Sequence, residues 1–382
     1  MGEATHGTRE FFQLKHRLLE FLVREMGFRT LAMEASAAAS RAVNAYVQHG
    51  TGNARSALAG LGFWTWRTEE VLTMIEWMRE YNSAVPPQQR VTFAGIDPQR
   101  CAAALDALEA FLNNAAPERA APLRGTFDSL GTAAPGSLPD PERRLVHEAR
   151  ELTQFLQEER PALAVRTSNE AVDHALHNAA LVIRAADTAT RPLMSETATD
   201  SALAARDQYM ADTVAALHDE GPCDKAPGKV AVWAHNGHIM TGHYANGVPA
   251  LGLRLRERYG DAYYALGLLF GKGSFRARRD HKPTHPPARH GISSGGPRSV
   301  EAQLAAAHRT DHLVDLRRGK DSPPVDHWLN ERHYLRGFGS SVPRLTYRLQ
   351  LTPTTLANDY DGLAYLAKSS CTRLLDLPTP ET

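Results

Sequence analysis

The sequence TREFFQLKHRLLEFLVREMGFRTLAMEAS, residues 8–36, contains the first helix and the first strand of the predicted fold. Residues 8–26 carry apolar side chains at helical spacing, and Gly27 follows as a C-cap; these side chains are Phe11, Phe12, Leu14, Leu18, Leu19, Leu22 and Val23. Residues 28–34 then form a short apolar run around Met33, which predicts a buried strand. A helix followed directly by a strand is the alternation typical of α/β proteins.

The same alternation continues on both sides of a region that has no strand pattern. Before residue 114, the pattern predicts one more strand at 91–96 and three helices, at 35–48, 68–80 and 98–113. Thr68 is the expected N-cap of the second of these helices. After residue 226, it predicts a helix at 249–259 and four strands, at 230–234, 263–270, 313–316 and 363–366.

The region between these two halves is predicted to be a helical insertion. Residues 115–141 hold many Ala, Pro and Gly and little periodicity, which indicates a linker, and only helices are predicted from there to about residue 220. We therefore predict an α/β fold with a mainly parallel sheet covered by helices on both faces. The catalytic domain would comprise residues 1–114 and 226–382, and the linker and insertion residues 115–225.

Two segments are expected to depart from this regular pattern. Residues 271–298 are rich in Gly, Pro, Arg, Lys and His, which predicts a long loop, either a solvated loop or a lid that binds anions. The motif GEATHG, residues 2–7, would normally follow an apolar strand, but only Met1 precedes it. We therefore expect that strand to be missing from the sheet, which would leave its neighbours without a partner.

Composition excludes several classes of protein. The 382 residues include 43 basic and 43 acidic side chains, a balance that argues against nucleic-acid binding and against a polybasic membrane-surface protein. No apolar run reaches the length of a membrane span, and the N-terminus lacks an apolar signal region. Cys101, Cys223 and Cys371 form no CxxC pair, so neither a disulfide framework nor a zinc–thiolate site is predicted. A reducing, cytoplasmic location is expected, with the oligomeric state left open.

Polar side chains stand at the ends of three predicted strands. Glu34 ends the first strand, Asp97 follows the second, and His235 follows the third, with His238 one turn further on. Ligands of parallel sheets bind beyond the carboxyl ends of the strands, so these side chains are expected to converge. Glu3 and His6, in the turn before the first helix, would lie at the same edge.

At these residues the sequence resembles the erythromycin esterase family. The resemblance rests on the opening segment GEATHGTREFFQLKHRLLEFLVREMGF with RTLAMEAS, and on VAVWAHNGHI at 230–239. WRTEEVLTMIEWMREYN, FAGIDPQ and RDQYM continue it between them, and DYDGLAYL echoes it near the end. The resemblance implies that His6 is the general base that activates water. It also implies functional roles for Glu3, Glu34 and His235, and for Lys15, where the family often has a basic residue.

The chemistry of these side chains agrees with that implication. Histidine exchanges a proton near neutral pH, and a neighbouring carboxylate fixes its tautomer and supports its charged form. A second histidine or a lysine can stabilise the oxyanion of a tetrahedral intermediate, so that water attacks directly and no serine nucleophile is needed. We thus predict His6, Glu3, Glu34 and His235 as catalytic residues. We predict that Lys15, His238 and Asp97 bind the substrate. We expect the reaction to need no cofactor and no metal.

Several of these residues could instead have a purely structural role. His6 could be an ordinary turn residue, and Glu34 could form a salt bridge with Lys15 or Arg17. Asp97 could cap the helix that begins at Pro98, and His235 and His238 could be loop histidines bonded to backbone. Trp64 and Trp66 could line a pocket or pack in the core.

The sequence also contains residues that could support two other catalytic mechanisms. Glu3, His6, Glu34, His235 and His238 are all possible ligands of zinc or manganese, but no local ligand pair such as HExxH occurs. Residues 291–295, GISSG, match GxSxG, but a nucleophile elbow needs an apolar strand before it and a helix directly after it. PPARH and GGPRS flank the motif instead, so a serine hydrolase is disfavoured.

The sequence thus predicts a hydrolase of small-molecule esters or lactones, with a macrolide-like lactone as the substrate that the resemblance implies. Two alternatives stay open. One is a protein of natural-product or polysaccharide biosynthesis, on the same fold but with a different reaction. The other is a binding protein without catalytic activity.

Overall fold

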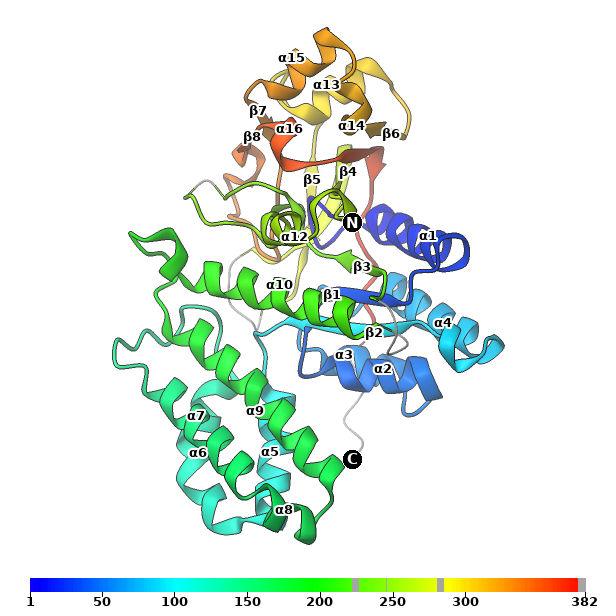
Figure 1. The fold of residues 1–382 in the computed structure, drawn as a ribbon. Helices are drawn as coiled ribbons and strands as arrows, with labels where there is room; N and C mark the ends of the chain where they lie inside the picture. Colours follow the sequence, from blue (N-terminus) through cyan, green and yellow to red (C-terminus); the bar gives the residue numbers. More distant parts are fainter. Residues whose placement is uncertain (222–226, 245, 280–284, 377–382) are drawn as a thin grey trace.

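The computed structural model describes residues 1–221, 227–244, 246–279 and 285–376. Helices and strands alternate at both ends of the chain, around a run of helices (Figure 1). The elements up to the third strand are α1 (Arg9–Met26), β1 (Thr30–Ser36), α2 (Ser40–His49), α3 (Ala54–Gly60), α4 (Glu69–Ala84), β2 (Thr92–Asp97), α5 (Ala102–Ala115), α6 (Pro117–Gly131), α7 (Arg144–Glu158), α8 (Arg160–Arg166), α9 (Asn169–Thr190), α10 (Ala202–Glu220) and β3 (Val230–Trp233). The elements after it are α11 (Asn236–Ile239), α12 (Leu251–Tyr259), β4 (Leu266–Ala277), β5 (Ala288–Ile292), α13 (Val300–Ala307), β6 (His312–Asp315), α14 (Leu316–Gly319), α15 (Pro323–Asn330), β7 (His333–Leu335), β8 (Thr352–Thr354), α16 (Leu356–Asp359) and β9 (Gly362–Ser369).

Residues 8–36 form α1 and β1 as predicted. Gly27 ends the helix in a left-handed conformation, with φ of 71°, and its N–H binds the Leu22 carbonyl. All seven residues of β1 are buried, because β1 pairs in parallel with β2 on one side and β3 on the other. The register sets Met33 beside both Gly95 and Trp233, so the three strands end at a common edge.

The N-terminal segment joins this sheet to a second one. β4 and β9 pair in parallel, and the antiparallel strands β5 and β6 flank them in the order β5-β4-β9-β6. The amino group of Met1 donates to the Val232 carbonyl at 2.8 Å, and the Gly2 N–H donates to the Leu266 carbonyl at 2.7 Å. Met1 and Gly2 thus lie between β3 and β4, where the expected strand was missing. Both neighbouring strands thus have backbone hydrogen-bond partners in this segment, while β2-β1-β3 and β5-β4-β9-β6 remain two separate sheets.

Two segments differ from the prediction. Residues 271–298 were expected to form a loop, but β4 extends to Ala277 and pairs with β5, antiparallel, across the described part of this segment. Residues 115–141 were expected to be a linker, but most of them form α6, which starts with Pro117 at its first turn. Its buried residues Thr126 and Leu130 pack in the helical region, so tertiary packing outweighs the weak local periodicity.

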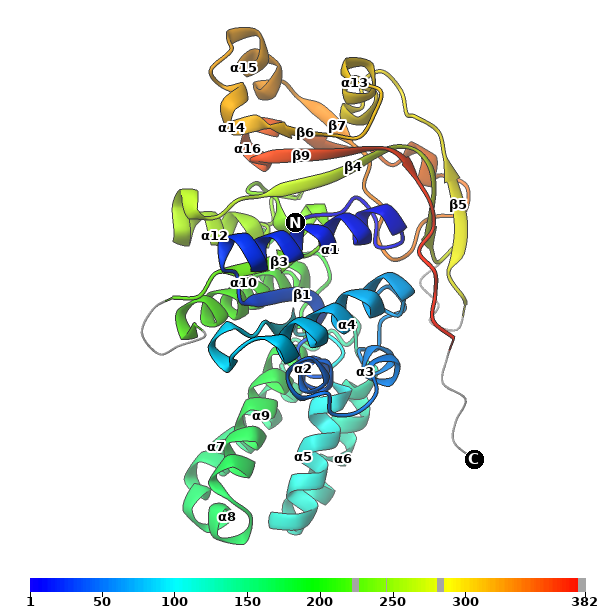
Figure 2. The same cartoon turned by 90° about the vertical axis from the view of Figure 1, so that its right-hand side faces the viewer.

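The helices α5 to α9 have a hydrophobic core of their own. Buried residues from Cys101 to Ala189 form that core, below the sheet in Figure 2. The following helix, α10, instead contributes Met210, Ala211 and Val214 to the core around the strands. It packs against all three parallel strands, whereas α1 contacts β3 and β9 (Figure 2). The prediction of a mainly parallel sheet covered by helices, with a helical insertion, is therefore confirmed.

Two further sequence expectations concern membrane spans and cysteines. Among the described residues, no helix has both the length and the apolar character that crossing a membrane requires. Cys101 and Cys371 carry free thiols, and Cys223 lies outside the described residues.

Candidate active site

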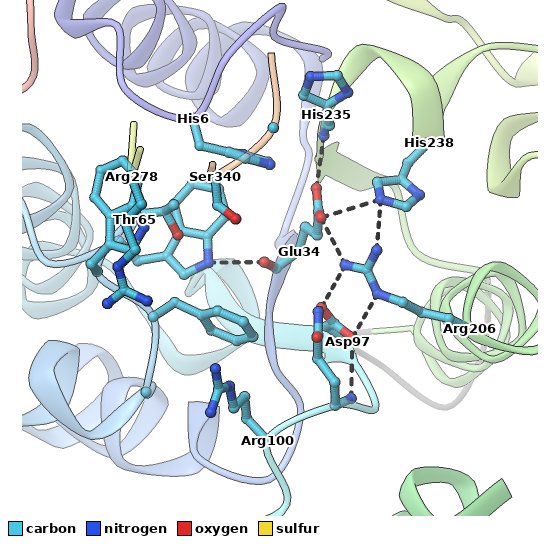
Figure 3. A pocket seen from close by; sticks show the side chains of 16 residues that line it. His6, Glu34, Thr65, Asp97, Arg100, Arg206, His235, His238, Arg278 and Ser340 are labelled. Atoms are coloured by element: carbon cyan, nitrogen blue, oxygen red, sulfur yellow. Dashed lines mark hydrogen bonds and ion pairs between the residues drawn. The ribbon is translucent and has the colours of Figure 1, made fainter. Parts of the chain in front are cut away.

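A cavity of about 460 Å³ opens at the carboxyl edge of the parallel strands (Figure 3). Its walls are formed by the segments 62–66, 99–100 and 339–340, and by His6, Glu34, Asp97, Arg206, His235, His238 and Arg278. The strand-end rule thus brings Glu34, Asp97 and His235 together, and the turn before α1 adds His6. Trp64 and Trp66 both line the cavity and are both buried, so they serve the core and the pocket alike.

His6 is held by the carboxylate three residues before it. Its Nδ1 lies 2.7 Å from Oε1 of Glu3, which has no exposed surface. A carboxylate only accepts, so the ring proton sits on Nδ1 and the lone pair of Nε2 is left for another partner. Gly7 fixes the turn, because a Cβ there would overlap the Arg276 carbonyl of β4. Glu3 thus sets the tautomer of His6, and Glu3 and the turn at Gly7 together set its orientation.

Lys15 supports Glu3 rather than a ligand. Sequence analysis placed Lys15 among the substrate-binding residues, but its side chain is completely buried and does not line the cavity. Its ammonium donates to Oε2 of Glu3 at 2.7 Å and lies 4.5 Å from the Trp233 ring centroid. Burial, opposed by Glu3, lowers the pKa of Lys15 to about 8. For Glu3, burial favours the neutral acid, but Lys15 and His6 outweigh it and keep its pKa below the usual value.

His235 presents the opposite tautomer. The Gly237 N–H donates to Nδ1 of His235 at 3.1 Å, so the neutral ring carries its proton on Nε2. Burial, with His6 beside it, lowers the pKa of His235 to about 3, which keeps the ring neutral. Nε2 is buried and has no hydrogen-bond partner within the described part of the chain. Because the ring centroids of His6 and His235 are 5.2 Å apart, one side of the pocket holds both a proton acceptor and a proton donor.

Arg206 connects the other charged groups of the pocket (Figure 3). Its guanidinium binds both oxygens of Asp97, at 3.1 and 2.7 Å, and Oε1 of Glu34 at 2.8 Å. The second oxygen of Glu34 accepts the backbone N–H of His235 at 2.8 Å. Burial works against the charge on Glu34, but His238, His6 and Arg206 outweigh it and hold its pKa well below the usual range. Glu34 is thus a permanent anion that anchors the backbone of His235.

The structure places Glu34 differently from the predicted arrangement. Glu34 was predicted to be catalytic together with His6 and His235, but its side chain bonds to neither of their rings. It contacts Nε2 of His238 at 3.2 Å, and Glu3 orients His6 instead. The salt bridge suggested for Glu34 is present, but its partner is Arg206, not Lys15 or Arg17.

The other ring nitrogen of His238 faces a second buried carboxylate. Nδ1 lies 2.8 Å from Oδ1 of Asp207 and 2.7 Å from the hydroxyl of Tyr244, which itself donates to Oδ2 of Asp207. Burial opposes the charged form of His238, but Asp207 and Glu34 outweigh it and raise its pKa to about 10. His238 therefore lies between two carboxylates that favour its charged form, and Nη1 of Arg206 also lies 2.9 Å from its Nε2.

We expect His238 to stabilise the fold most at low pH. Its folded-state pKa of about 10 lies above the ordinary value of 6.5, so its stabilisation is complete below about pH 6.5. That stabilisation is lost as the pH rises toward 10. Urea unfolding of the wild type and of His238→Gln would measure the effect. The difference in unfolding free energy should shrink from about pH 6 to about pH 10. A difference that stays constant or grows would contradict this assignment.

Sequence reasoning missed Arg206, Asp207 and Tyr244. Arg206 and Asp207 belong to the segment RDQYM, which carried part of the resemblance but no assigned role. Both lie on the face of α10 that packs over the strands, and Arg206 reaches the pocket from there. An arginine next to an aspartate, directly after the apolar run Ala202–Ala205, was the available signal, because buried charges are rare unless paired.

The described residues contain no group of three or more His, Cys, Asp or Glu side chains arranged to hold a metal ion. The carboxylates that were possible ligands have other partners: Glu34 binds Arg206, and Glu3 binds Lys15. The GxSxG match at 291–295 lies outside the pocket lining. β5 ends within it, at Ile292, but the next helix begins only at Val300, so it forms no nucleophile elbow.

The pocket at this sheet edge contains a histidine–glutamate pair, a neutral second histidine and an arginine shared by two carboxylates. These groups can donate and accept protons, as acid–base chemistry requires. Residues 23–369 match the model of the erythromycin esterase family, and the chain belongs to that family. The resemblance noted in the sequence is thereby confirmed.

Individual relatives agree with this assignment. The chain is 28% identical over 290 residues to an erythromycin esterase type II of Escherichia coli, covering 70% of this chain and 67% of that protein. A solved structure from Bacillus cereus is similar in fold, with a TM-score of 0.76 at 23% identity over 98% of this chain and 89% of that one. An erythromycin esterase variant in an open conformation has a TM-score of 0.69 at 15% identity, covering 99% and 92%.

Proposed function

We propose that this protein hydrolyses an ester or lactone by direct attack of water. Family and fold support a hydrolase of the esterase type. The observation that carries the proposal is the pair of facing histidines with opposite tautomers. His6 offers a lone pair on Nε2, and His235 offers an N–H on Nε2, with 5.2 Å between the ring centroids.

The proposed reaction uses these two rings in sequence. A water molecule donates a proton to Nε2 of His6 while its oxygen attacks the carbonyl carbon. Glu3 stabilises the imidazolium that forms, and Nε2–H of His235 donates to the oxyanion of the tetrahedral intermediate. When the intermediate collapses, the C–O bond to the alcohol breaks and His6 returns its proton to the leaving oxygen. An acid and an alcohol result, which in a lactone remain on one molecule.

The name of the Escherichia coli relative supports macrolide lactones as the first substrates to test. Ligand pockets usually measure about 300–1,000 Å³. A cavity of about 460 Å³ lies within that range, and aromatic side chains at 63, 64 and 66 give it an apolar wall suited to the carbon skeleton of such a lactone.

A panel of macrolide lactones and simple esters, followed by mass spectrometry, would test the proposed function. Hydrolysis adds the mass of one water to a lactone and splits an ester into its acid and alcohol. No product from any compound with folded protein would count against a hydrolase. A product of any other mass would favour the alternative of a different reaction on the same fold.

We expect hydrolysis to proceed without a metal ion. The site carboxylates already have cationic partners, and His6 obtains its orientation from Glu3, so protein groups supply both the base and the oxyanion donor. Prolonged dialysis against a chelator, with elemental analysis of the product, should leave turnover unchanged. Loss of turnover that zinc or manganese restores would show that a metal takes part.

A further inference from the structure

The carboxylates that line the pocket have positively charged partners, whereas Arg100 has no carboxylate partner among the described residues. The carboxylates that line it, Glu34 and Asp97, both bind Arg206, and His238 adds a further positive charge against Glu34. Arg100 also lines the cavity. Within the part of the chain that the structure describes, no carboxylate forms an ion pair with Arg100, and its Nε has no hydrogen-bond partner. Its guanidinium carbon lies 5.8 Å from the ring centroid of Phe63, another pocket residue.

The backbone at Arg100 adopts a conformation that is strained for a residue with a side chain. Its φ is 63°, in the left-handed region that side chains other than glycine rarely adopt. The hydroxyl of Ser36 donates to the Arg100 carbonyl at 2.8 Å and holds that conformation. A glycine would adopt it without strain, so an arginine at this position costs some stability, as is common for residues in functional sites.

The position of Arg100 relative to the histidines suggests its use. In Figure 3, the Arg100 guanidinium lies across the pocket from the rings of His6 and His235, with Asp97 to one side. An arginine that is partly shielded from water binds a carboxylate or phosphate strongly, because its planar fork can donate two parallel hydrogen bonds. Such a group on a substrate would be placed away from the bond that the histidines attack.

We propose that Arg100 binds an oxyanionic group of the substrate, so that the enzyme selects esters or lactones that carry a carboxylate or phosphate at a distance from the scissile bond. This inference rests on the proposed hydrolysis, whose substrate class it narrows. Arg100 is here a specificity-determining residue, and the chemistry itself stays with His6 and His235.

A matched pair of substrates tests the selectivity. The 4-nitrophenyl hemisuccinate carries a free carboxylate, and its methyl ester is the same molecule without the charge. Losing a hydrogen bond to a charged group costs about tenfold or more, so Arg100→Gln should lower kcat/KM for the hemisuccinate by that factor. The methyl ester should be unaffected. Arg309→Gln removes the same charge from an exposed position outside the pocket and serves as the control.

Arg100→Gly guards against misfolding, because glycine adopts the left-handed backbone freely. This variant should melt at the same temperature as the wild type or higher, and should lose the preference for the hemisuccinate. If both esters are hydrolysed equally well and neither variant changes their ratio, the inference is overturned while the proposed function stands.

A binding measurement separates the two proposals. Calorimetric titration of the His6→Ala variant with succinate and with inorganic phosphate reports on oxyanion binding without hydrolysis. Binding of either ion that is lost in His6→Ala, Arg100→Gly supports the inference even if no ester is ever cleaved, and the tighter ion identifies the preferred oxyanion. Binding of neither ion, or binding that Arg100→Gly leaves unchanged, overturns it.

Discussion

Replacing His6 with alanine is expected to lower kcat for ester hydrolysis by about 10²- to 10⁴-fold, the usual contribution of general acid–base catalysis. The reason lies in the contact between Nδ1 of His6 and Glu3, which leaves Nε2 as the acceptor for a proton from water. KM should change less than kcat, because the base acts mainly in the transition state. Steady-state kinetics on a substrate identified in the panel would measure both constants.

The variant Glu3→Gln sharpens this test. It keeps the shape of the side chain but removes the charge that supports the imidazolium, so kcat should fall without a matching loss of substrate binding. It also leaves the buried Lys15 without its anion, so its melting temperature must be measured alongside. His49→Ala, at an exposed position outside the pocket, is the control. Near-normal turnover by folded His6→Ala would refute the role of His6 as the base.

Replacing His235 with alanine is expected to cost about 3 kcal/mol in the barrier, as the loss of an oxyanion donor does in other hydrolases. This corresponds to about a hundredfold in kcat. Because the pKa of His235 is about 3, the ring stays a neutral donor, and its contribution should be constant from about pH 5 to about pH 9. Kinetics of the wild type and His235→Ala across that range would show a constant ratio.

The double variant distinguishes one site from two. The two rings are 5.2 Å apart and would act on one reacting centre, so their losses should not add. His6→Ala, His235→Ala should be hardly slower than the slower single variant. Fully additive losses would mean that the two histidines act independently.

The strand pattern was sufficient to predict where the site lies. Glu34, Asp97 and His235 each follow an apolar run, and parallel strands in register must end together. The pairing of His6 with Glu3 was also predictable from their spacing in one short turn. The role of Glu34 was not, because its partner Arg206 is 172 residues away and only the packing of α10 brings it near.

The error at Lys15 has a local cause. Sequence reasoning treated its charge as available to a ligand, yet Lys15 lies four residues from both Phe11 and Leu19, on the buried face of α1. The helical periodicity of the sequence therefore already predicted that the Lys15 side chain is buried. The prediction of a loop at 271–298 was wrong for a different reason. β4 and β5 stabilise each other by pairing, and amino-acid composition does not show which strand a segment will pair with.

The ion pair between Asp97 and Arg206 also makes the helices α5 to α9 a separable branch of the protein. It ties together two positions 109 residues apart, one just before α5 and one in α10, and no residue from 101–205 lines the cavity. The branch has its own core, so it can open locally or vary in length while its two anchor points stay in place. The proposed active site thus takes no lining residue from its largest insertion, which approaches the site through the packing of α9 on α10.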